Sequence, residues 1–228
     1  LKPMGDLMDN RLTIITGHYG SGKTEFSVNY SIKCLEYYSK IILADLDIVN
    51  PYFRSREKAD FLNKLGIRVI GSSMMNSSME IPALTADING AIDDISSKTI
   101  MDIGGDPVGA RVLARYSNQI SVQGYDMFIV VNANRPETQT LEAVKKYINN
   151  IEISSKLKVS GLINNTHLLK STSIDDFYKG HTLCQEVTKD TGIPTVYEVA
   201  VRSIAEQIND LDIKIFPIDL YMREDWMS

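Results

Sequence analysis

One octapeptide constrains the fold of this chain more than any other feature of its sequence. Residues Gly17–Thr24 read Gly-His-Tyr-Gly-Ser-Gly-Lys-Thr and match the pattern GxxxxGK[ST]. The apolar run Arg11–Thr16 precedes them, and the helical stretch Lys23–Tyr38 follows. The pattern requires this context, because its glycines let the backbone turn at positive φ and the helix N-terminus then faces whatever the loop holds. The sequence therefore predicts a strand, a phosphate-binding loop and a helix in direct succession.

Each residue type in this loop has a chemical use. Backbone N–H groups brought together by the glycines can bind phosphate oxygens, and Lys23 adds a full positive charge that makes it a candidate catalytic residue. The Thr24 hydroxyl is a candidate Mg²⁺ ligand. We therefore expect the whole loop to bind a nucleotide, through Gly17, His18, Tyr19, Gly20, Ser21, Gly22, Lys23 and Thr24.

Three carboxylates are candidates to face the loop. Asp45 and Asp47 follow one apolar strand, and Asp102 follows another. Ligands bind at the carboxyl ends of strands in open α/β sheets, where these side chains are expected to gather. We predict that Asp45, Asp47 and Asp102 join Thr24 in holding Mg²⁺. Asp102 also begins a DxxG sequence, and the amide of its Gly105 is expected to meet the terminal phosphate.

The rest of the chain alternates between strands and helices. Short, nearly all-apolar strands separated by amphipathic helices are typical of a parallel sheet covered on both faces. We predict an α/β fold, a three-layer αβα P-loop NTPase fold with a mostly parallel central sheet, as a single domain over residues 1–228. Residues 1–10 are expected to be disordered or left over from cloning. The expected strands are Arg11–Thr16, Lys40–Ala44, Ile67–Ile70, Thr99–Met101, Asp126–Val131, Lys158–Ile163 and Thr195–Val199, and the expected helices are Lys23–Tyr38, Phe53–Leu65, Thr85–Ile95, Pro107–Ile120, Pro136–Asn150 and Ile174–Thr188.

Two further segments carry a family resemblance. Ile41–Arg54 (IILADLDIVNPYFR) is an apolar strand followed by DxD, and Gly161–Asn165 (GLINN) is a later strand that ends in two asparagines. With the octapeptide and the DxxG sequence, they resemble the Min/Par/Mrp-like (SIMIBI-class) P-loop ATPases of the CobQ/CobB/MinD/ParA superfamily over most of the chain. The resemblance implies that Asp47 orients or activates the attacking water, that Asp45 supports Mg²⁺, and that Asn165 hydrogen-bonds adenine.

One position departs from this resemblance. The deviant members of the family carry a signature lysine after the first glycine of the loop, and this chain has His18 there. A shorter side chain that is mostly neutral near pH 7 argues against a nucleotide-sandwich dimer with a lysine acting in trans, and leaves a homodimer open. Arg54 and Arg56 are candidate replacements, because arginine can clamp phosphate bidentately.

The nucleotide is expected to be ATP, or its product ADP, with Mg²⁺. Ras-like GTPases read guanine with an [NT]KxD motif. The nearest candidates in this chain, Asn164–His167 and Thr188–Thr191, do not fit that motif.

The charge of the chain argues against two classes of partner. It has 24 Lys and Arg against 29 Asp and Glu, a net charge of −5, whereas nucleic-acid binding needs a clustered positive surface. Residues 201–228 carry a net charge of −3, so we expect no binding to an anionic membrane of the kind that a basic amphipathic helix provides.

Cys34 and Cys184 lack the spacing of a disulfide framework or a zinc site, and we expect a cytoplasmic protein.

These features favour a Mg-ATP-dependent ATPase of slow intrinsic turnover that switches conformation and acts on an unidentified protein client. The segments Ile48–Arg56 and Ile103–Arg111 would sense the γ-phosphate and are expected to dock the client. Two alternatives stay open. One is an ATP-dependent small-molecule ligase or kinase of the dethiobiotin or cobyrinate type, with Ser72–Met79 shaping its pocket, and the other is a non-hydrolysing nucleotide sensor, which His18 suggests.

Overall fold

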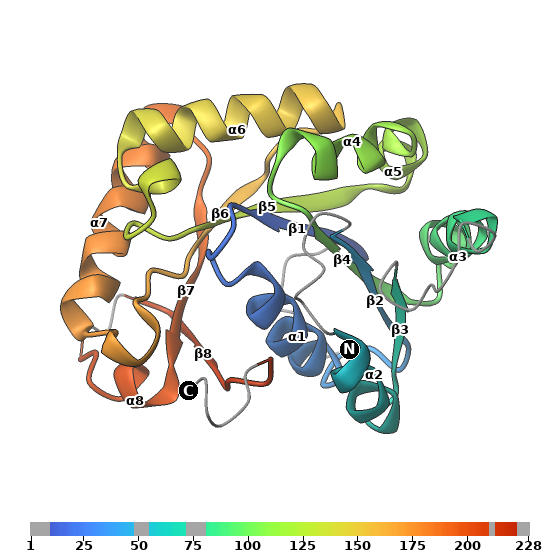
Figure 1. Cartoon of the computed structure of the whole chain (residues 1–228), viewed down its shortest axis with the longest axis horizontal. Coiled ribbons are helices and arrows are strands. Elements are labelled where there is room, and N and C mark those ends of the chain that lie inside the picture. The colour runs from blue at the N-terminus through green and yellow to red at the C-terminus, as the bar shows by residue number, and fades with distance from the viewer. Residues whose placement is uncertain (1–9, 48–54, 72–80, 210–212, 223–228) are drawn as a thin grey trace.

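One open sheet organises the structure, a computed structural model that describes residues 10–47, 55–71, 81–209 and 213–222. Within these ranges the sheet has eight strands in the order β3-β2-β4-β1-β5-β6-β7-β8, and every neighbouring pair is parallel. Figure 1 shows the sheet running through the molecule with helices above and below it. The strands are β1 (Leu12–Gly17), β2 (Ile41–Leu46), β3 (Ile67–Gly71), β4 (Lys98–Ile103), β5 (Tyr125–Val131), β6 (Gly161–Asn164), β7 (Thr195–Val201) and β8 (Ile215–Ile218).

The helices form the outer layers. None of those in the described ranges combines the length and the apolarity that crossing a bilayer requires. They are α1 (Lys23–Cys34), α2 (Ser55–Lys64), α3 (Ile81–Asp93), α4 (Pro107–Ala114), α5 (Ser117–Gln123), α6 (Leu141–Ser155), α7 (Ile174–Thr191) and α8 (Arg202–Ala205), with short 3₁₀ turns η3 (Pro136–Thr138) and η4 (Leu169–Ser171).

The sheet separates two hydrophobic cores, which confirms the predicted three-layer α/β fold. Successive side chains of a strand point to opposite faces. In β1, Leu12 and Ile14 therefore pack into the core beneath α3 to α7, whereas Ile15 packs into the core beneath α1 and α2. Because the central strands are buried on both faces, they read in the sequence as continuous apolar runs rather than as an alternating pattern.

The strand order positions the phosphate loop. β1 lies between β4 and β5, so the chain builds one half of the sheet on one side of β1 and the other half on its other side. Ligands bind at such a switch point, beyond the carboxyl ends of the strands. Ile15 of β1 is level with Asp102 of β4, and Gly17 is level with Val130 of β5. The loop after Gly17 therefore leaves the sheet beside the ends of both neighbours.

Two predicted helices are interrupted. The predicted helix Pro107–Ile120 is divided into α4 and α5, because the chain tightens at Tyr116, whose N–H bonds to the carbonyl three residues back rather than four. The predicted helix Pro136–Asn150 is η3 followed by α6. The break is set by Thr140, which has extended backbone and accepts a hydrogen bond from the N–H of Ala143 at 3.2 Å as the N-cap of α6.

Other boundaries also differ from the sequence prediction. Helix α1 ends at Cys34 instead of Tyr38, because the N–H groups of the next three residues bond to carbonyls three residues back. The predicted strand Lys158–Ile163 is shifted and shortened to β6. The sequence does not predict β8 or α8. Strand β8 is four residues long and contains Pro217, which only an edge strand tolerates well, and α8 is a single turn.

The segment Asp219–Met222, here called the C-terminal strap, is fastened to α1. The buried carboxylate of Glu25 accepts a hydrogen bond from the backbone N–H of Tyr221 at 2.6 Å. One turn further along α1, the Asn29 amide donates to the carbonyl of Asp219 and accepts from its N–H, both at 2.9 Å. The Tyr221 ring also stacks on a phenylalanine of α2, with the ring centroids 5.6 Å apart. The strap therefore joins the helix of the phosphate loop to its neighbour.

Two helical glycines provide a matched test of the packing. A Cβ at Gly180 of α7 would collide with the side chains of Thr166 and Asn164, whereas nothing lies within 4 Å of a Cβ at Gly90 of α3. We expect Gly180→Ala to lower the free energy of unfolding by about 1–3 kcal/mol, because it displaces buried hydrogen-bonded groups. Gly90→Ala is expected to raise it by about 0.5–1 kcal/mol through helix propensity. Chemical denaturation measures both, and equal effects would contradict the close approach of α7.

Candidate functional site

The phosphate loop, Gly17–Thr24, connects β1 to α1 at the carboxyl edge of the sheet. Gly20 and Gly22 have φ angles of 76° and 80°, in the left-handed region that favours glycine. Gly22 is the N-cap of α1, and the N–H of Ser21 bonds to the carbonyl of His18 at 3.0 Å. The glycines of the octapeptide thus stand where the turn requires them.

Lys23 forms a buried ion pair at the start of α1. Its Nζ lies 2.8 Å from Oδ2 of Asp47, and the two side chains are only 8% and 7% exposed. Burial lowers the pKa of Lys23, but the charges of Asp102 and Asp47 more than offset it, so the pKa is raised overall. The lysine therefore carries its positive charge in a largely desolvated position.

Asp102, at the end of β4, is a buried carboxylate without a hydrogen bond. It is 1% exposed, and neither of its oxygens has a hydrogen-bond partner in the described part of the chain. Burial raises its pKa to about 7, although the charge of Lys23 and a weak hydrogen-bonding interaction with the Thr24 hydroxyl, too poorly aligned to count as a full hydrogen bond, act in the opposite direction. A buried, unsatisfied carboxylate costs free energy. Its position is explained if a ligand supplies the missing partner.

The predicted metal ligands come together at this point. Asp45 of β2 is level with Asp102 of β4, and its Oδ1 accepts a hydrogen bond from the N–H of Asp47 at 3.2 Å. Within the described residues these carboxylates do not form a closed metal-binding cluster. Mg²⁺ usually binds one or two carboxylates and completes its shell with water and phosphate oxygens. With the hydroxyl of Thr24, the oxygen donors present fit this ion.

The DxxG sequence lies against the phosphate loop. A Cβ on Gly105 would collide with the carbonyl oxygen of Gly17, so only glycine permits the two segments to approach this closely. The Tyr147 hydroxyl, on α6, donates to the carbonyl of Gly105 at 2.7 Å. The next residue, Asp106, caps α4 by accepting from the N–H of Gly109 at 2.6 Å. The DxxG segment is therefore in contact with the loop at one end and with α4 at the other.

Two asparagines bind carbonyl groups of the loop. Asn165 follows β6, and its Nδ2 donates to the carbonyl of Ser21 at 2.8 Å. Asn132 follows β5, and its Nδ2 lies 3.3 Å from the carbonyl oxygen of Gly20. The resemblance assigns Asn165 to a nucleobase. The structure places its amide nitrogen on the loop, which leaves Oδ1 as the group that could meet a base.

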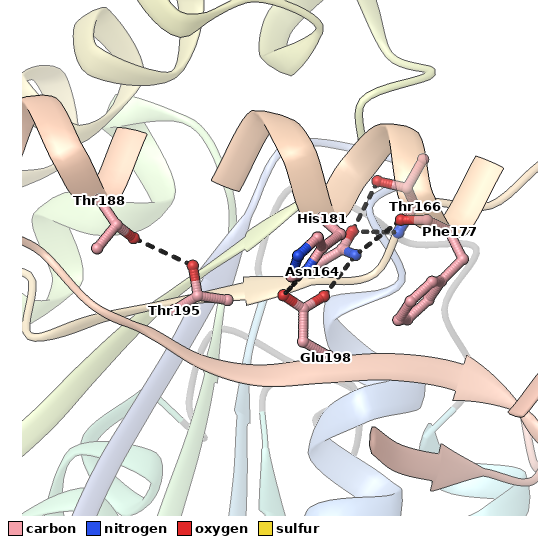
Figure 2. Close-up of polar contacts among 7 residues, drawn as sticks. All are labelled: Asn164, Thr166, Phe177, His181, Thr188, Thr195 and Glu198. Atoms are coloured by element: carbon pink, nitrogen blue, oxygen red, sulfur yellow. Dashed lines mark hydrogen bonds and ion pairs between the residues drawn. The ribbon is translucent and has the colours of Figure 1, made fainter. Parts of the chain in front are cut away.

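A buried polar network supports the end of β6 (Figure 2). The Asn164 amide donates to Oε2 of Glu198 at 2.7 Å and to the carbonyl of Phe177 at 3.2 Å. Its Oδ1 accepts from the hydroxyl of Thr166 at 2.8 Å. The other oxygen of Glu198 lies 2.8 Å from Nδ1 of His181, on α7. Because these bonds fix the residues on both sides of Asn165, they also fix the direction of its side chain.

His18 points toward a residue of its own chain. Its Nδ1 lies 3.5 Å from Oε2 of Glu137, in η3, and its ring meets that of Tyr147 edge-on with centroids 6.1 Å apart. The neighbouring Tyr19 is 69% exposed. The residue at the signature-lysine position therefore lies against η3 and α6 of its own chain.

Arg135 is a loop contact that the sequence prediction missed. It lies between β5 and η3, and its Nε donates to the carbonyl of Gly20 at 3.3 Å. Sequence reasoning proposed Arg54 and Arg56 instead. Arg54 and the side chain of Arg56 lie outside the described residues, as does the segment Ser72–Met79. The sequence position of Arg135, shortly after a strand end, could have drawn attention to it, because the same kind of position identified the aspartates.

A pocket opens beside the loop at Gly22. Its walls are mainly apolar and come from α7, β7, α8, β8 and the C-terminal strap, with a few polar groups near the loop. This composition is typical of a small-molecule binding site. The lining residues are Gly22, Glu25, Asn165, Thr166, His167, Leu169, Thr172, Phe177, Val199, Ala200, Val201, Ile204, Ile218 and Leu220.

The fold is that of the P-loop NTPases. No protein-family model and no curated protein matches the sequence. Solved structures do match the fold. Cell division protein FtsY from Thermotoga maritima is 16% identical, with a TM-score of 0.54 over 82% of this chain and 60% of that chain. Chloroplast FtsY from Physcomitrella patens is 15% identical, with a TM-score of 0.55 over 83% of this chain and 58% of that chain.

A third similar structure is FlhF complexed with GTP and Mg²⁺. It is 15% identical, with a TM-score of 0.54 over 82% of this chain and 64% of that chain. This chain therefore spans about three fifths of the length of the structures it matches. Such low identities establish the fold alone. FtsY and FlhF share the P-loop NTPase fold expected from the sequence, but they do not support the narrower Min/Par/Mrp-like assignment.

Replacing Asp102 tests whether its burial costs stability. We expect Asp102→Asn to raise the free energy of unfolding of the ligand-free protein by about 1–3 kcal/mol at pH 8, where the wild-type carboxylate is mostly ionised, because it removes an unsatisfied buried charge. Chemical denaturation measures the change. Asp126→Asn is the matched control, since this buried carboxylate accepts from the N–H and Nδ2 of Asn10 at 3.3 and 3.1 Å and should lose stability when replaced. Destabilisation by both substitutions would contradict the interpretation of Asp102.

Proposed function

We propose that this protein is a Mg-ATP-dependent P-loop ATPase that acts as a nucleotide-dependent switch on a protein client. The observation that carries the proposal is the buried group of charges at a glycine loop: Lys23 paired with Asp47, beside the unsatisfied Asp102. Buried charges without full hydrogen bonding are costly, and they concentrate at functional sites. A Mg-nucleotide would supply partners for the lysine, the carboxylates and the loop amides together.

The residues have complementary tasks in this proposal. Lys23 turns from Asp47 to the phosphates when a nucleotide binds, and the freed Asp47 then orients the attacking water. Thr24, Asp45 and Asp102 would hold Mg²⁺, which neutralises charge on the phosphates when bound. The exchange of partners by Lys23 links nucleotide binding to the position of Asp47.

Several observations support ATP rather than GTP. Guanine presents an amino donor that is typically read by an acidic side chain, and Glu25 is the carboxylate among the described lining residues of the pocket. Glu25 already accepts the backbone N–H of Tyr221 in the strap. Adenine presents an amino donor that the Oδ1 of Asn165 could accept. The similar FlhF and Elizabethkingia anophelis FtsY structures hold GTP and GDP, so direct competition between ATP and GTP is the deciding measurement.

The switch would act through the DxxG segment. Gly105 touches Gly17 of the loop and accepts a hydrogen bond from Tyr147 of α6. A terminal phosphate arriving at the loop competes for the space and the amide of Gly105, and the displacement passes to α4 through Asp106. A client protein that binds α4 would then bind differently to the ATP-bound and ADP-bound forms. His18 lies against Glu137, and the chain lacks a lysine at the signature position, which is compatible with slow intrinsic turnover.

Lys23 provides the first test. We expect Lys23→Ala to weaken ATP binding by at least about 100-fold, because a desolvated charge on the phosphates is lost, and to abolish phosphate release. Lys33→Ala is the matched control, since this exposed lysine of the same helix pairs with Glu36. Titration calorimetry and phosphate release measure the two effects.

Asp47→Ala should retain binding but lose turnover. Equal phosphate release from wild type, Lys23→Ala and Asp47→Ala would refute the ATPase.

Asn165 provides a test of the base. We expect Asn165→Ala to weaken ATP more than inorganic tripolyphosphate, because its Oδ1 meets the base while its Nδ2 supports the loop. Asn132→Ala, which removes a loop contact without a pocket position, should weaken both ligands to a similar extent. The ratio of the two dissociation constants in each variant is the measurement. The same ratio in both variants would mean that Asn165 does not touch the base.

A further inference from the structure

Arg135 brings a second positive charge to the phosphate loop. Its Nε donates to the carbonyl of Gly20 at 3.3 Å. A Cβ at Gly20 would lie 2.8 Å from the guanidinium carbon, so the flat guanidinium group rests directly on the loop backbone where a side chain would otherwise stand. The glycine at this position therefore serves two purposes, since it permits the positive φ of 76° and it admits the arginine.

Most of the hydrogen-bonding capacity of Arg135 is unused by the protein. A guanidinium has five N–H donors, and within the described residues one of them is used, by Gly20. No carboxylate in those residues forms an ion pair with it. Glu137, the nearest acidic residue in the sequence, lies instead against His18. The side chain is half-buried, so bulk water reaches only part of it.

The other charged groups at the site explain why a second full positive charge would be useful there. Lys23 is surrounded by Asp47, Asp45 and Asp102, so its charge is shared among carboxylates. The loop amides and the start of α1 contribute partial charges only. Arg135 reaches the loop from β5, on the opposite side of β1 from β4 and β2, the strands that carry the carboxylates. It is therefore a full positive charge at the loop that the carboxylates do not neutralise.

We propose that Arg135 is a phosphate-binding residue of the nucleotide site, contacting the phosphate chain from the outer side of the loop at Gly20. This inference rests on the proposed nucleotide function. Phosphate is the group that fits, because the guanidinium fork matches phosphate oxygens bidentately and its anchor is the phosphate loop itself. Arg135 would thus supply, from within the same chain, positive charge that His18 at the signature-lysine position does not provide.

The competing explanation is that Arg135 only braces the loop at Gly20. Two substitutions separate the roles. Arg135→Gln removes the charge, and Arg135→Lys keeps the charge but loses the fork. Asn132→Ala is the matched control for bracing, since Asn132 donates to the same carbonyl of Gly20 without a charge. Arg115→Gln, between α4 and α5, controls for loss of an arginine away from the loop.

The experiment measures dissociation constants for adenosine, AMP, ADP and ATP with Mg²⁺ by calorimetry at two salt concentrations, and the melting temperature without nucleotide. We expect Arg135→Gln to leave adenosine binding unchanged and to weaken ATP by about 10- to 100-fold, the loss appearing where the contacted phosphate is added. Arg135→Lys should lie between the two. The salt dependence of ATP binding should fall in Arg135→Gln, whereas the melting temperature without nucleotide should stay within about 1–2 °C of wild type.

Two results would overturn the inference. One is ATP affinity in Arg135→Gln equal to that of wild type and of Arg115→Gln. The other is a lower melting temperature in Arg135→Gln with equal weakening of all four ligands, as expected for a brace and for Asn132→Ala. A wild-type protein that binds none of the nucleotides would overturn the proposed function as well. That failure is distinguishable, because it appears before any substitution is made.

Discussion

The ion pair between Lys23 and Asp47 is the interaction on which the rest of the site depends. A lysine that is 8% exposed needs a carboxylate at contact distance, and this one is 2.8 Å away. To provide it, β4 and β2 must lie in succession beside β1, so that Asp102 and the segment after Asp45 end beside the loop. The order of the strands is therefore what brings these charged side chains together. Each core supports this arrangement from its own face of the sheet.

Side chains hold the loop through its carbonyl groups. Gly20 and Ser21 accept side-chain hydrogen bonds from Asn132, Arg135 and Asn165, which follow β5 and β6. Backbone polar groups in a partly buried loop need partners. Two loop carbonyls therefore have their partners within the chain itself. The network around Asn164 and Glu198 then keeps these donors in place (Figure 2).

The sequence predicts the sheet well because its strands are apolar on both faces, and it predicts the loop because glycines and a lysine at fixed spacing leave few alternatives. The breaks in the helices escaped prediction, since each depends on a local hydrogen bond such as the cap at Thr140. Strand β8 escaped because Pro217 interrupts a short pattern that only the edge of a finished sheet can stabilise. Arg135 escaped because its position after β5 does not by itself show that its side chain folds back onto Gly20.

The C-terminal strap has a consequence for the order in which the protein becomes complete during synthesis. Glu25 and its partner Tyr221 are 196 residues apart in the chain. At about 5–20 residues per second, the ribosome adds the second roughly 10–40 s after the first. Until then the Glu25 carboxylate, directly beside Thr24, lacks its backbone partner and one wall of the neighbouring pocket is missing. The pocket beside Gly22 therefore cannot be complete until the strap has been synthesised.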